Sequence, residues 1–202
     1  MSAPVVTVEN RACEYSRYPY GVPMDWHIFL IGLGGVGKTS TGPHLAKLVG
    51  CEFVDLDDLF MSGPGRIGRY IKDHGYARYV RENSKLFFEH IFRRSWPCVC
   101  ALSSGFLIPD VEIETVELNR AAVKGKGYSV LLLPHAEDDE CAKIVAARQV
   151  QRGLNLRHEI EHPKFLARLP VYRSLADQVT VFQGGPKGAA HSIFAALGKI
   201  AT

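Results

Sequence analysis

The segment from residue 32 to residue 39 combines the residue types and the spacing of a phosphate-binding loop. Its sequence, G-L-G-G-V-G-K-T, fits the pattern G-x-x-x-x-G-K-S/T, whose glycines let backbone N–H groups turn inward around a phosphate. In this pattern Lys38 reaches the β- and γ-phosphates, and the Thr39 hydroxyl coordinates Mg²⁺. We expect the Lys38 side chain to face solvent when no ligand is bound. The residues expected to bind nucleotide are Gly34, Gly35, Val36, Gly37, Lys38, Thr39 and Ser40.

The same loop has two other interpretations. Gly32, Gly34 and Gly37 also satisfy G-x-G-x-x-G, the dinucleotide fingerprint, and Asp55 lies about the expected distance downstream. The polar residues directly after Gly37 disfavour it, because a dinucleotide-binding helix packs closely against its strand there. At 202 residues the chain is also short for a six-stranded dinucleotide fold plus a substrate domain. A purely structural glycine turn is the third interpretation.

Asp55 and Asp57 stand two residues apart at the end of a short apolar run. If the chain stays extended, both carboxylates point to the same side, at the edge where open α/β sheets bind ligands. In a phosphoryl-transfer enzyme, one carboxylate holds the metal through water and the other accepts the proton of a substrate hydroxyl. The alternative is a helix N-cap, which requires one Asp, whereas residues 55–58 contain three.

The elements that position these residues alternate along the chain. Short apolar strands are expected at residues 26–31, 51–54, 97–102, 128–133 and 178–182, and helices at 39–49, 66–73, 76–93, 137–152, 162–175 and 186–197. Such alternation predicts a parallel sheet covered by helices on both faces. Residues 1–25 lack periodicity and contain three prolines, so we interpret them as an N-terminal extension of a domain spanning residues 26–202.

The composition argues against several functional classes. The formal net charge is +3 and no run of five Lys or Arg occurs, which disfavours a nucleic-acid-binding protein. The five cysteines form no C-x-x-C pair, which argues against a zinc site and a disulfide framework. No apolar stretch reaches the roughly 18 residues of a membrane span, and the first 25 residues hold no apolar signal core. We therefore expect a cytoplasmic protein with no membrane partner.

Residues 28–58 resemble the shikimate kinase family of small P-loop kinases. The phosphate loop is followed there by T-G-P-H-L-A-K-L-V-G and by F-V-D-L-D-D, a combination more specific than the loop alone. Weaker agreement returns at R-L-P-V-Y, residues 168–172, and at A-D, residues 176–177. The resemblance covers residues 26 to about 182. It implies a three-layer α/β/α P-loop kinase fold with a five-stranded parallel sheet, ATP and Mg²⁺ as cofactors, and a small-molecule acceptor.

The resemblance also implies roles for individual residues. Asp57 matches the carboxylate that binds the acceptor hydroxyls, and Asp55 matches the carboxylate near the metal. Arg168 matches an arginine that grips the acceptor carboxylate, with a surface salt bridge as the alternative. Pro186, at the start of the last expected helix, is included among the nucleotide contacts.

Two departures from the family affect the acceptor half. The family carries G-x-x-x-F-R-x-x-E on the helix after the second strand, and counting from Gly75 places Val80 at the arginine. Val80 lies on an apolar stripe, so we expect it in the core. The adjacent Arg81 is then the substitute anion ligand, unless it belongs to a solvated face. The family's T-G-G-G after the third strand is L-S-S-G here, where we expect Ser104 and Gly105 to contact the acceptor.

We expect a lid at residues 145–160, but no single arginine in it matches the lid arginine of the family. The family's R-P-L-L tetrapeptide, whose arginine covers the transferred phosphate, is absent. Arg148 and Arg152 are the expected catalytic cations, which would stabilise transition-state oxygens, and Arg157 is a third candidate. A solvated helix end is the alternative.

The function expected from the sequence is Mg²⁺- and ATP-dependent phosphoryl transfer to a hydroxyl of a small anionic metabolite, with shikimate as the first candidate. Three alternatives stay open. They are, in order, a kinase for another polyol or sugar acid, a catalytically weak nucleotide-binding regulatory domain, and a dinucleotide oxidoreductase. The sequence does not indicate an oligomeric state.

Overall fold

The computed structural model describes residues 26–151, 157–182 and 184–199. Within them the chain forms a five-stranded parallel sheet in the order β2-β3-β1-β4-β5. The strands are β1 (His27–Ile31), β2 (Glu52–Asp55), β3 (Cys98–Ala101), β4 (Gly127–Leu133) and β5 (Gln178–Val181). β1 lies in the centre and is buried along its whole length, and its register places Leu30 beside Ala101 and Val130.

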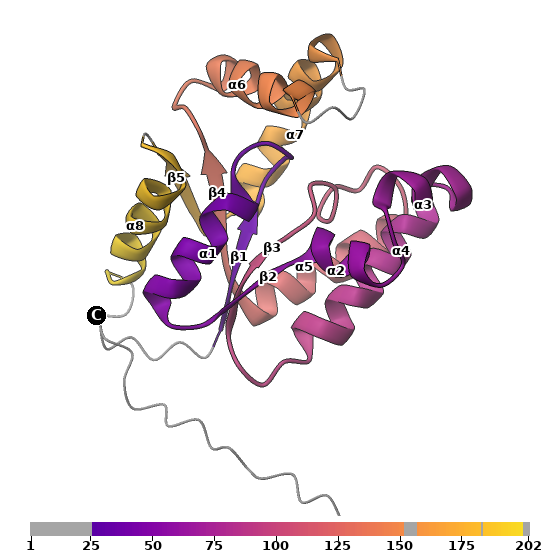
Figure 1. Ribbon diagram of the computed structural model, residues 1–202, viewed down its shortest axis with the longest axis horizontal. Helices are drawn as coiled ribbons and strands as arrows, with labels where there is room; N and C mark the ends of the chain where they lie inside the picture. The colour runs from indigo at the N-terminus through magenta and orange to yellow at the C-terminus, as the bar shows by residue number, and fades with distance from the viewer. Residues whose placement is uncertain (1–25, 152–156, 183, 200–202) are drawn as a thin grey trace, which may run out of the picture.

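Helices cover both faces of this sheet (Figure 1). They are α1 (Lys38–Val49), α2 (Leu56–Ser62), α3 (Ile67–His74), α4 (Tyr76–Phe87), α5 (Ile113–Lys126), α6 (Asp138–Gln151), α7 (His158–Leu175) and α8 (Gly185–Leu197). α1 and α8 pack against each other on one face, and α4 and α5 lie against the other. Phe87 of α4 packs on Phe29 of β1, with ring centroids 5.9 Å apart. The predicted three-layer α/β/α fold with a five-stranded parallel sheet is confirmed.

Some element boundaries differ from the prediction. α2 and α5 have no counterpart among the predicted helices. The buried residues of α5 are Val116, Asn119, Ala122 and Val123, so an amide and small groups replace the clear apolar stripe that signals a helix. The helix predicted at 76–93 ends at Phe87 and continues as a π-helical turn, η1 (Phe88–Phe92). α7 begins at His158, before the predicted start at residue 162.

The carboxyl ends of the strands meet at one edge of the sheet. Since β3 pairs in parallel with both β1 and β2, the loops that follow these three strands converge at that edge. The loop after β1 stands near the top of the molecule in Figure 1, below α6. This is the edge at which open α/β sheets bind ligands.

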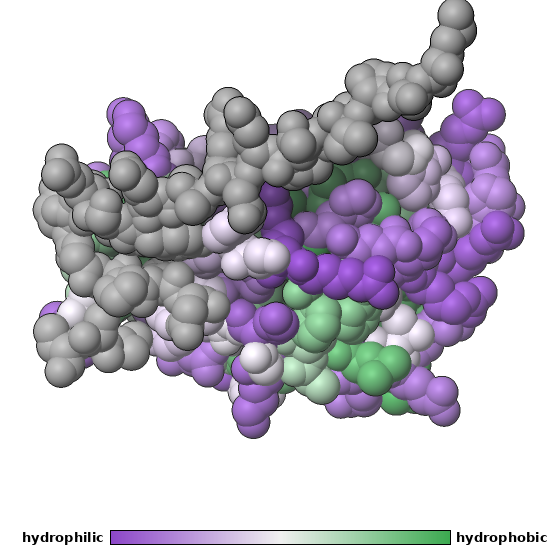
Figure 2. All heavy atoms as spheres, turned by 90° about the horizontal axis from the view of Figure 1, so that it is seen from below, coloured by the Kyte–Doolittle hydropathy of each residue, from purple (hydrophilic) through white to green (hydrophobic). Residues whose placement is uncertain are grey.

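Figure 2 shows hydrophilic side chains over much of the face seen from below, with apolar groups between them. The described cysteines are free thiols; Cys98, Cys100 and Cys141 are buried and Cys51 is half-buried. Burial raises the pKa of the Cys51 thiol to about 11, so this thiol stays protonated at neutral pH. No helix in the described ranges is both long enough and apolar enough to span a bilayer.

Candidate active site

The loop between β1 and α1 has the backbone of a phosphate cradle. Gly32, Gly35 and Gly37 have φ values of +123°, +87° and +106°, in the left-handed region that favours glycine. Gly37 is also the N-cap of α1, and no side chain caps the helix. The first N–H groups of α1 therefore point toward the loop, where an anion is favoured by the helix dipole.

Lys38 is buried within this loop. Its Nζ donates to the carbonyl oxygens of Gly32 at 2.6 Å and Leu33 at 3.0 Å, and only 8% of the residue is exposed. The expectation that Lys38 faces solvent without ligand is therefore wrong. An ammonium group inside a glycine-rich concavity needs acceptors, and the loop's own carbonyls supply them.

The end of α6 lies directly on the phosphate loop. Arg148 Nη1 donates to the carbonyl oxygen of Gly35 at 3.1 Å. An ideal Cβ on Gly34 would lie 2.2 Å from Nε2 of Gln149. Of the predicted lid arginines, the structure thus brings Arg148 to the loop, whereas Arg152 lies outside the described residues. Arg157 is the N-cap of α7.

Three other predicted nucleotide ligands lie in the first turns of α1 and α8. Thr39 and Ser40, in the first turn of α1, are exposed. Pro186 is in the first turn of α8 and is also exposed. Phe182, which follows β5, lies beside the loop, because its Cζ is 3.6 Å from an ideal Cβ on Gly37. Binding roles for all three residues stay predictions.

Asp55 ends β2 and caps α2. Its Oδ1 accepts a hydrogen bond from the Asp57 N–H at 2.9 Å, and the residue is 7% exposed. The premise that the chain stays extended through Asp57 is wrong, because helix α2 begins at Leu56. The N-cap alternative is therefore correct for Asp55. The carboxylate that caps α2 is that of Asp55 and not that of Asp57. Burial, together with the nearby Asp55 and Asp57, raises the pKa of the Asp58 carboxyl.

Asp57 belongs to a hydrogen-bond network at the carboxyl edge. The Ser103 hydroxyl, after β3, donates to Asp57 Oδ1 at 2.5 Å. The Tyr79 side chain of α4 lies close enough to Ser103 and Asp57 for both to influence its hydroxyl. Burial, reinforced by the charge of Asp57, raises the pKa of the Tyr79 hydroxyl, so Tyr79 stays neutral. Tyr79 stands at the aromatic position of the family's G-x-x-x-F-R-x-x-E pattern, and Asp57, whose charge influences it, lies 22 residues earlier in the sequence.

The loop after β3 is enclosed by two further tyrosines. The Tyr172 hydroxyl of α7 donates to the Ser104 carbonyl oxygen. The Tyr76 hydroxyl of α4 lies against Gly105, where an ideal Cβ would be 2.4 Å from that oxygen. Ser104 and Gly105, predicted acceptor contacts, therefore sit at the meeting point of α4, α7 and the β3 edge.

The two predicted anion ligands are paired with acids of this protein. Arg168 of α7 forms an ion pair with Asp110, and Arg81 of α4 forms one with Glu112. The structure thus shows a salt bridge at Arg168, as in the alternative, and the anion-binding role of Arg168 stays a prediction. The Arg81 side chain is 55% exposed. Val80, which stands in place of the family's arginine, is 6% exposed and lies in the core as predicted.

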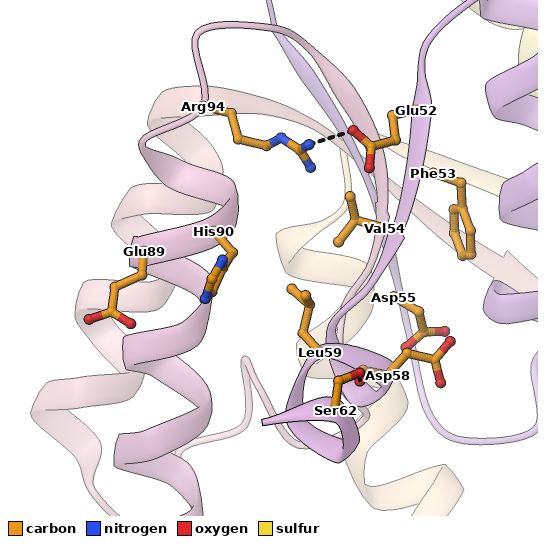
Figure 3. A pocket seen from close by; sticks show the side chains of 10 residues that line it. All are labelled: Glu52, Phe53, Val54, Asp55, Asp58, Leu59, Ser62, Glu89, His90 and Arg94. Carbon is orange, nitrogen blue, oxygen red and sulfur yellow. Dashed lines mark hydrogen bonds and ion pairs between the residues drawn. The ribbon is translucent and has the colours of Figure 1, made fainter. Parts of the chain in front are cut away.

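A separate cavity of about 490 Å³ flanks the free edge of β2, between α2 and η1 (Figure 3). Asp55 and Asp58 border it, and the ion pair between Glu52 and Arg94 lies across its upper end in this view. Its lining includes no residue of the phosphate loop. Asp55 is the one predicted site residue that it shares with the carboxyl edge.

Comparisons with known proteins agree with this site. The family model for shikimate kinase matches residues 34–197. Shikimate kinase 2 of Pectobacterium atrosepticum is 27% identical over 168 residues, which are 82% of this chain and 84% of that protein. The shikimate kinase of Bordetella avium is 26% identical, over 78% of this chain and 72% of that protein.

The fold has counterparts among solved structures. The shikimate kinase of Acinetobacter baumannii, determined in complex with shikimate, superposes with a TM-score of 0.66 and 24% identity. The match covers 85% of this chain and 92% of that one. Since the family model spans most of the chain, including most of the phosphate loop and all of α7 and α8, this protein belongs to the shikimate kinase family and is a small-molecule kinase.

Proposed function

We propose that the protein transfers the γ-phosphoryl group of ATP, with Mg²⁺, to a hydroxyl of a small anionic acceptor, with shikimate as the first candidate. The observation that carries the proposal is the position of Asp57. Its carboxylate is held by Ser103 at the ends of β2 and β3, next to the β1 end that bears the phosphate loop. Relatives named shikimate kinase, and one bound to shikimate, support the choice of acceptor.

The residues present fit a nucleoside triphosphate and its metal. The left-handed glycines and the uncapped start of α1 offer N–H groups to phosphate oxygens. Lys38 would exchange the carbonyls of Gly32 and Leu33 for the β- and γ-phosphates. Thr39 and, through water, Asp55 would hold Mg²⁺, whose charge neutralises the phosphates during transfer.

The chain's other residues would bind and orient the acceptor. Asp57 would accept the hydrogen bond, and then the proton, of the attacking hydroxyl. The Ser103 hydroxyl fixes the direction of that carboxylate. Arg168 would attract the acceptor's anion, and Arg148, already on the loop, would bring positive charge to the transferred phosphate.

A kinase for another polyol or sugar acid is the second candidate. Val80 is buried in place of an arginine, so one expected carboxylate ligand is missing. Ser103 and Ser104 also replace glycines at the acceptor floor. These side chains change the volume and the hydrogen-bonding groups available to the acceptor.

A coupled assay of ADP release tests the proposal. Shikimate, a panel of hydroxy acids and a panel of uncharged polyols are supplied one at a time, with ATP and Mg²⁺, and products are identified by mass. Shikimate-dependent ADP release above the acceptor-free rate supports the proposal. Turnover with another acceptor alone favours the second candidate. Nucleotide binding without turnover on any acceptor indicates a regulatory domain.

A further inference from the structure

We propose that Asp110 is a specificity-determining residue, which competes with the carboxylate of the acceptor for Arg168. The inference rests on the proposed function, because it concerns the acceptor half of the same site. It assigns a role to a residue in the loop between β3 and α5 that no family motif marked in the sequence.

The contact itself occupies the anion-binding end of Arg168. Arg168 Nη2 is paired with Asp110 Oδ2 across 58 residues of sequence. The Arg168 side chain is 18% exposed and that of Asp110 is 47% exposed. A guanidinium binds a carboxylate through its planar fork of N–H donors. An acceptor carboxylate that approaches the Nη2 side of the guanidinium would meet Asp110 there, so the two anions compete for it and repel each other.

The pair lies beside the acceptor floor. Tyr172, four residues after Arg168 on α7 and therefore on the same helix face, donates to the Ser104 carbonyl. The Tyr76 hydroxyl lies against Gly105, and it is close enough to Arg168 and Asp110 for both charges to influence its pKa. Burial raises the pKa of the Tyr76 hydroxyl, Arg168 lowers it and Asp110 raises it. Ser103, which directly precedes Ser104 in this loop, donates a hydrogen bond to the Asp57 carboxylate.

The same loop also supplies the ion-pair partner of Arg81, the second predicted anion ligand. Glu112 pairs with Arg81 of α4, and its φ is +53°, the one positive value among the described non-glycine residues. L-residues rarely adopt this conformation. The Arg81–Glu112 ion pair thus connects the end of the β3–α5 loop to α4. Two residues earlier in the same loop, Asp110 forms its ion pair with Arg168 of α7.

This arrangement predicts how the site discriminates. An anionic acceptor must displace Asp110 from Arg168 before it binds, whereas an uncharged polyol pays no such cost. Because Asp110 is half exposed, its side chain can leave without unfolding the loop. A partly exposed pair is weaker than a buried one, and we expect a penalty of about tenfold in affinity, or ~1.4 kcal/mol.

The test compares the full-length wild-type protein with Asp110→Asn. Shikimate KM is measured at saturating ATP and Mg²⁺, and shikimate Kd by calorimetry with ADP and Mg²⁺ present. We expect both constants to fall about tenfold, with ATP KM unchanged. An uncharged polyol such as inositol should show no gain. In an Arg168→Ala background, Asp110→Asn should have no effect, which a merely structural role of Asp110 would not produce.

Glu117→Gln is the matched control. Glu117 pairs with Arg120 at 2.7 Å, with side-chain exposures of 56% and 20%, close to those of the Asp110–Arg168 pair. The substitution makes the same change in net charge at an acid paired with Arg120 and not with Arg168, so shikimate KM should change far less than with Asp110→Asn.

The outcomes separate the inference from the proposed function. If wild type phosphorylates shikimate and Asp110→Asn leaves KM and Kd unchanged, Asp110 does not affect acceptor binding, and if both constants rise, Asp110 positions Arg168. Either result overturns the inference. If Asp110→Asn binds shikimate tenfold tighter but neither protein transfers phosphate, the inference stands and the proposed function fails. If neither protein binds shikimate, both are overturned.

Discussion

The Lys38 ammonium group donates to the carbonyls of Gly32 and Leu33, so the proposed binding of phosphate by Lys38 would be an exchange of acceptors. Lys38→Ala should lower phosphoryl transfer by about 10²- to 10³-fold, the scale of one lost transition-state donor. It should also lower unfolding stability by about 1 kcal/mol, since a hydrogen-bond donor is lost from the loop.

The measurements for Lys38→Ala are the coupled assay and thermal unfolding. Lys47→Ala, at an exposed lysine of the same helix, is the control and should leave both unchanged. Retention of most of the turnover by Lys38→Ala would contradict the kinase mechanism.

Asp57 differs from Asp55 in that its carboxylate does not cap α2. Asp57→Asn should reduce kcat by about 10²-fold or more, the usual scale for a lost acid–base group, with ATP KM little changed. Asp58→Asn removes an adjacent exposed carboxylate and should be near normal, and Ser103→Ala should be intermediate. Steady-state kinetics of the three variants, compared with wild type, measure these changes in kcat and ATP KM. A near-normal Asp57→Asn rate would leave Asp57 with a structural role only.

At the scale of elements, β1 and β3 are joined by a buried imidazole as well as by their ladder. His27 is 3% exposed, and its Nδ1 accepts a hydrogen bond from the Cys98 N–H at 3.2 Å. Burial lowers the pKa of His27, and the charges of Lys126 and Arg94 lower it further. The folded protein therefore binds this proton less readily than the unfolded chain, whose pKa is the ordinary 6.5.

The sign of the pH dependence follows from that difference. The stabilisation is complete above pH 6.5 and is lost as pH falls toward the lower folded pKa. Denaturant unfolding from pH 7.5 to about 5 should show a free energy that declines below pH 6.5. His27→Gln should flatten this decline, whereas His191→Gln, at an exposed site on α8, should not. Equal slopes in wild type and His27→Gln would refute the assignment.

How far the elements could be predicted depends on how local their signals are. Alternating apolar strands and helices, and the loop after β1, are local patterns, so sheet and phosphate loop were predictable from the sequence. α5 was not, because buried Asn119 breaks its apolar stripe. The pairing of Arg168 with Asp110 and of Ser103 with Asp57 spans 58 and 46 residues. Such pairs depend on how α4, α7 and the β3 loop dock, which no local pattern encodes.

At the scale of the whole molecule, the phosphate loop lies between the sheet and helix α6. α1 packs with α8 on one face, and α6 packs with α7 above the carboxyl edge. The loop touches α6 through Arg148 and Gln149 and lies beside Phe182 after β5. A ligand seated on this loop would lie beside α1, α6 and Phe182, which come from distant parts of the sequence, so its binding energy should stabilise the fold as a unit.

Thermal unfolding with and without nucleotide measures that coupling. ADP with Mg²⁺ at a hundredfold excess over its Kd adds about 2.7 kcal/mol by mass action, which raises Tm by about 5 to 10 °C for a chain of this size. Lys38→Ala should lose most of the shift because the phosphates lose their cation. NAD at the same concentration should give little or none, since a phosphate loop lacks the close helix–strand contact of a dinucleotide site. A larger shift with NAD than with ADP would mean that the glycines of the loop serve a dinucleotide, and the kinase mechanism would fall with it.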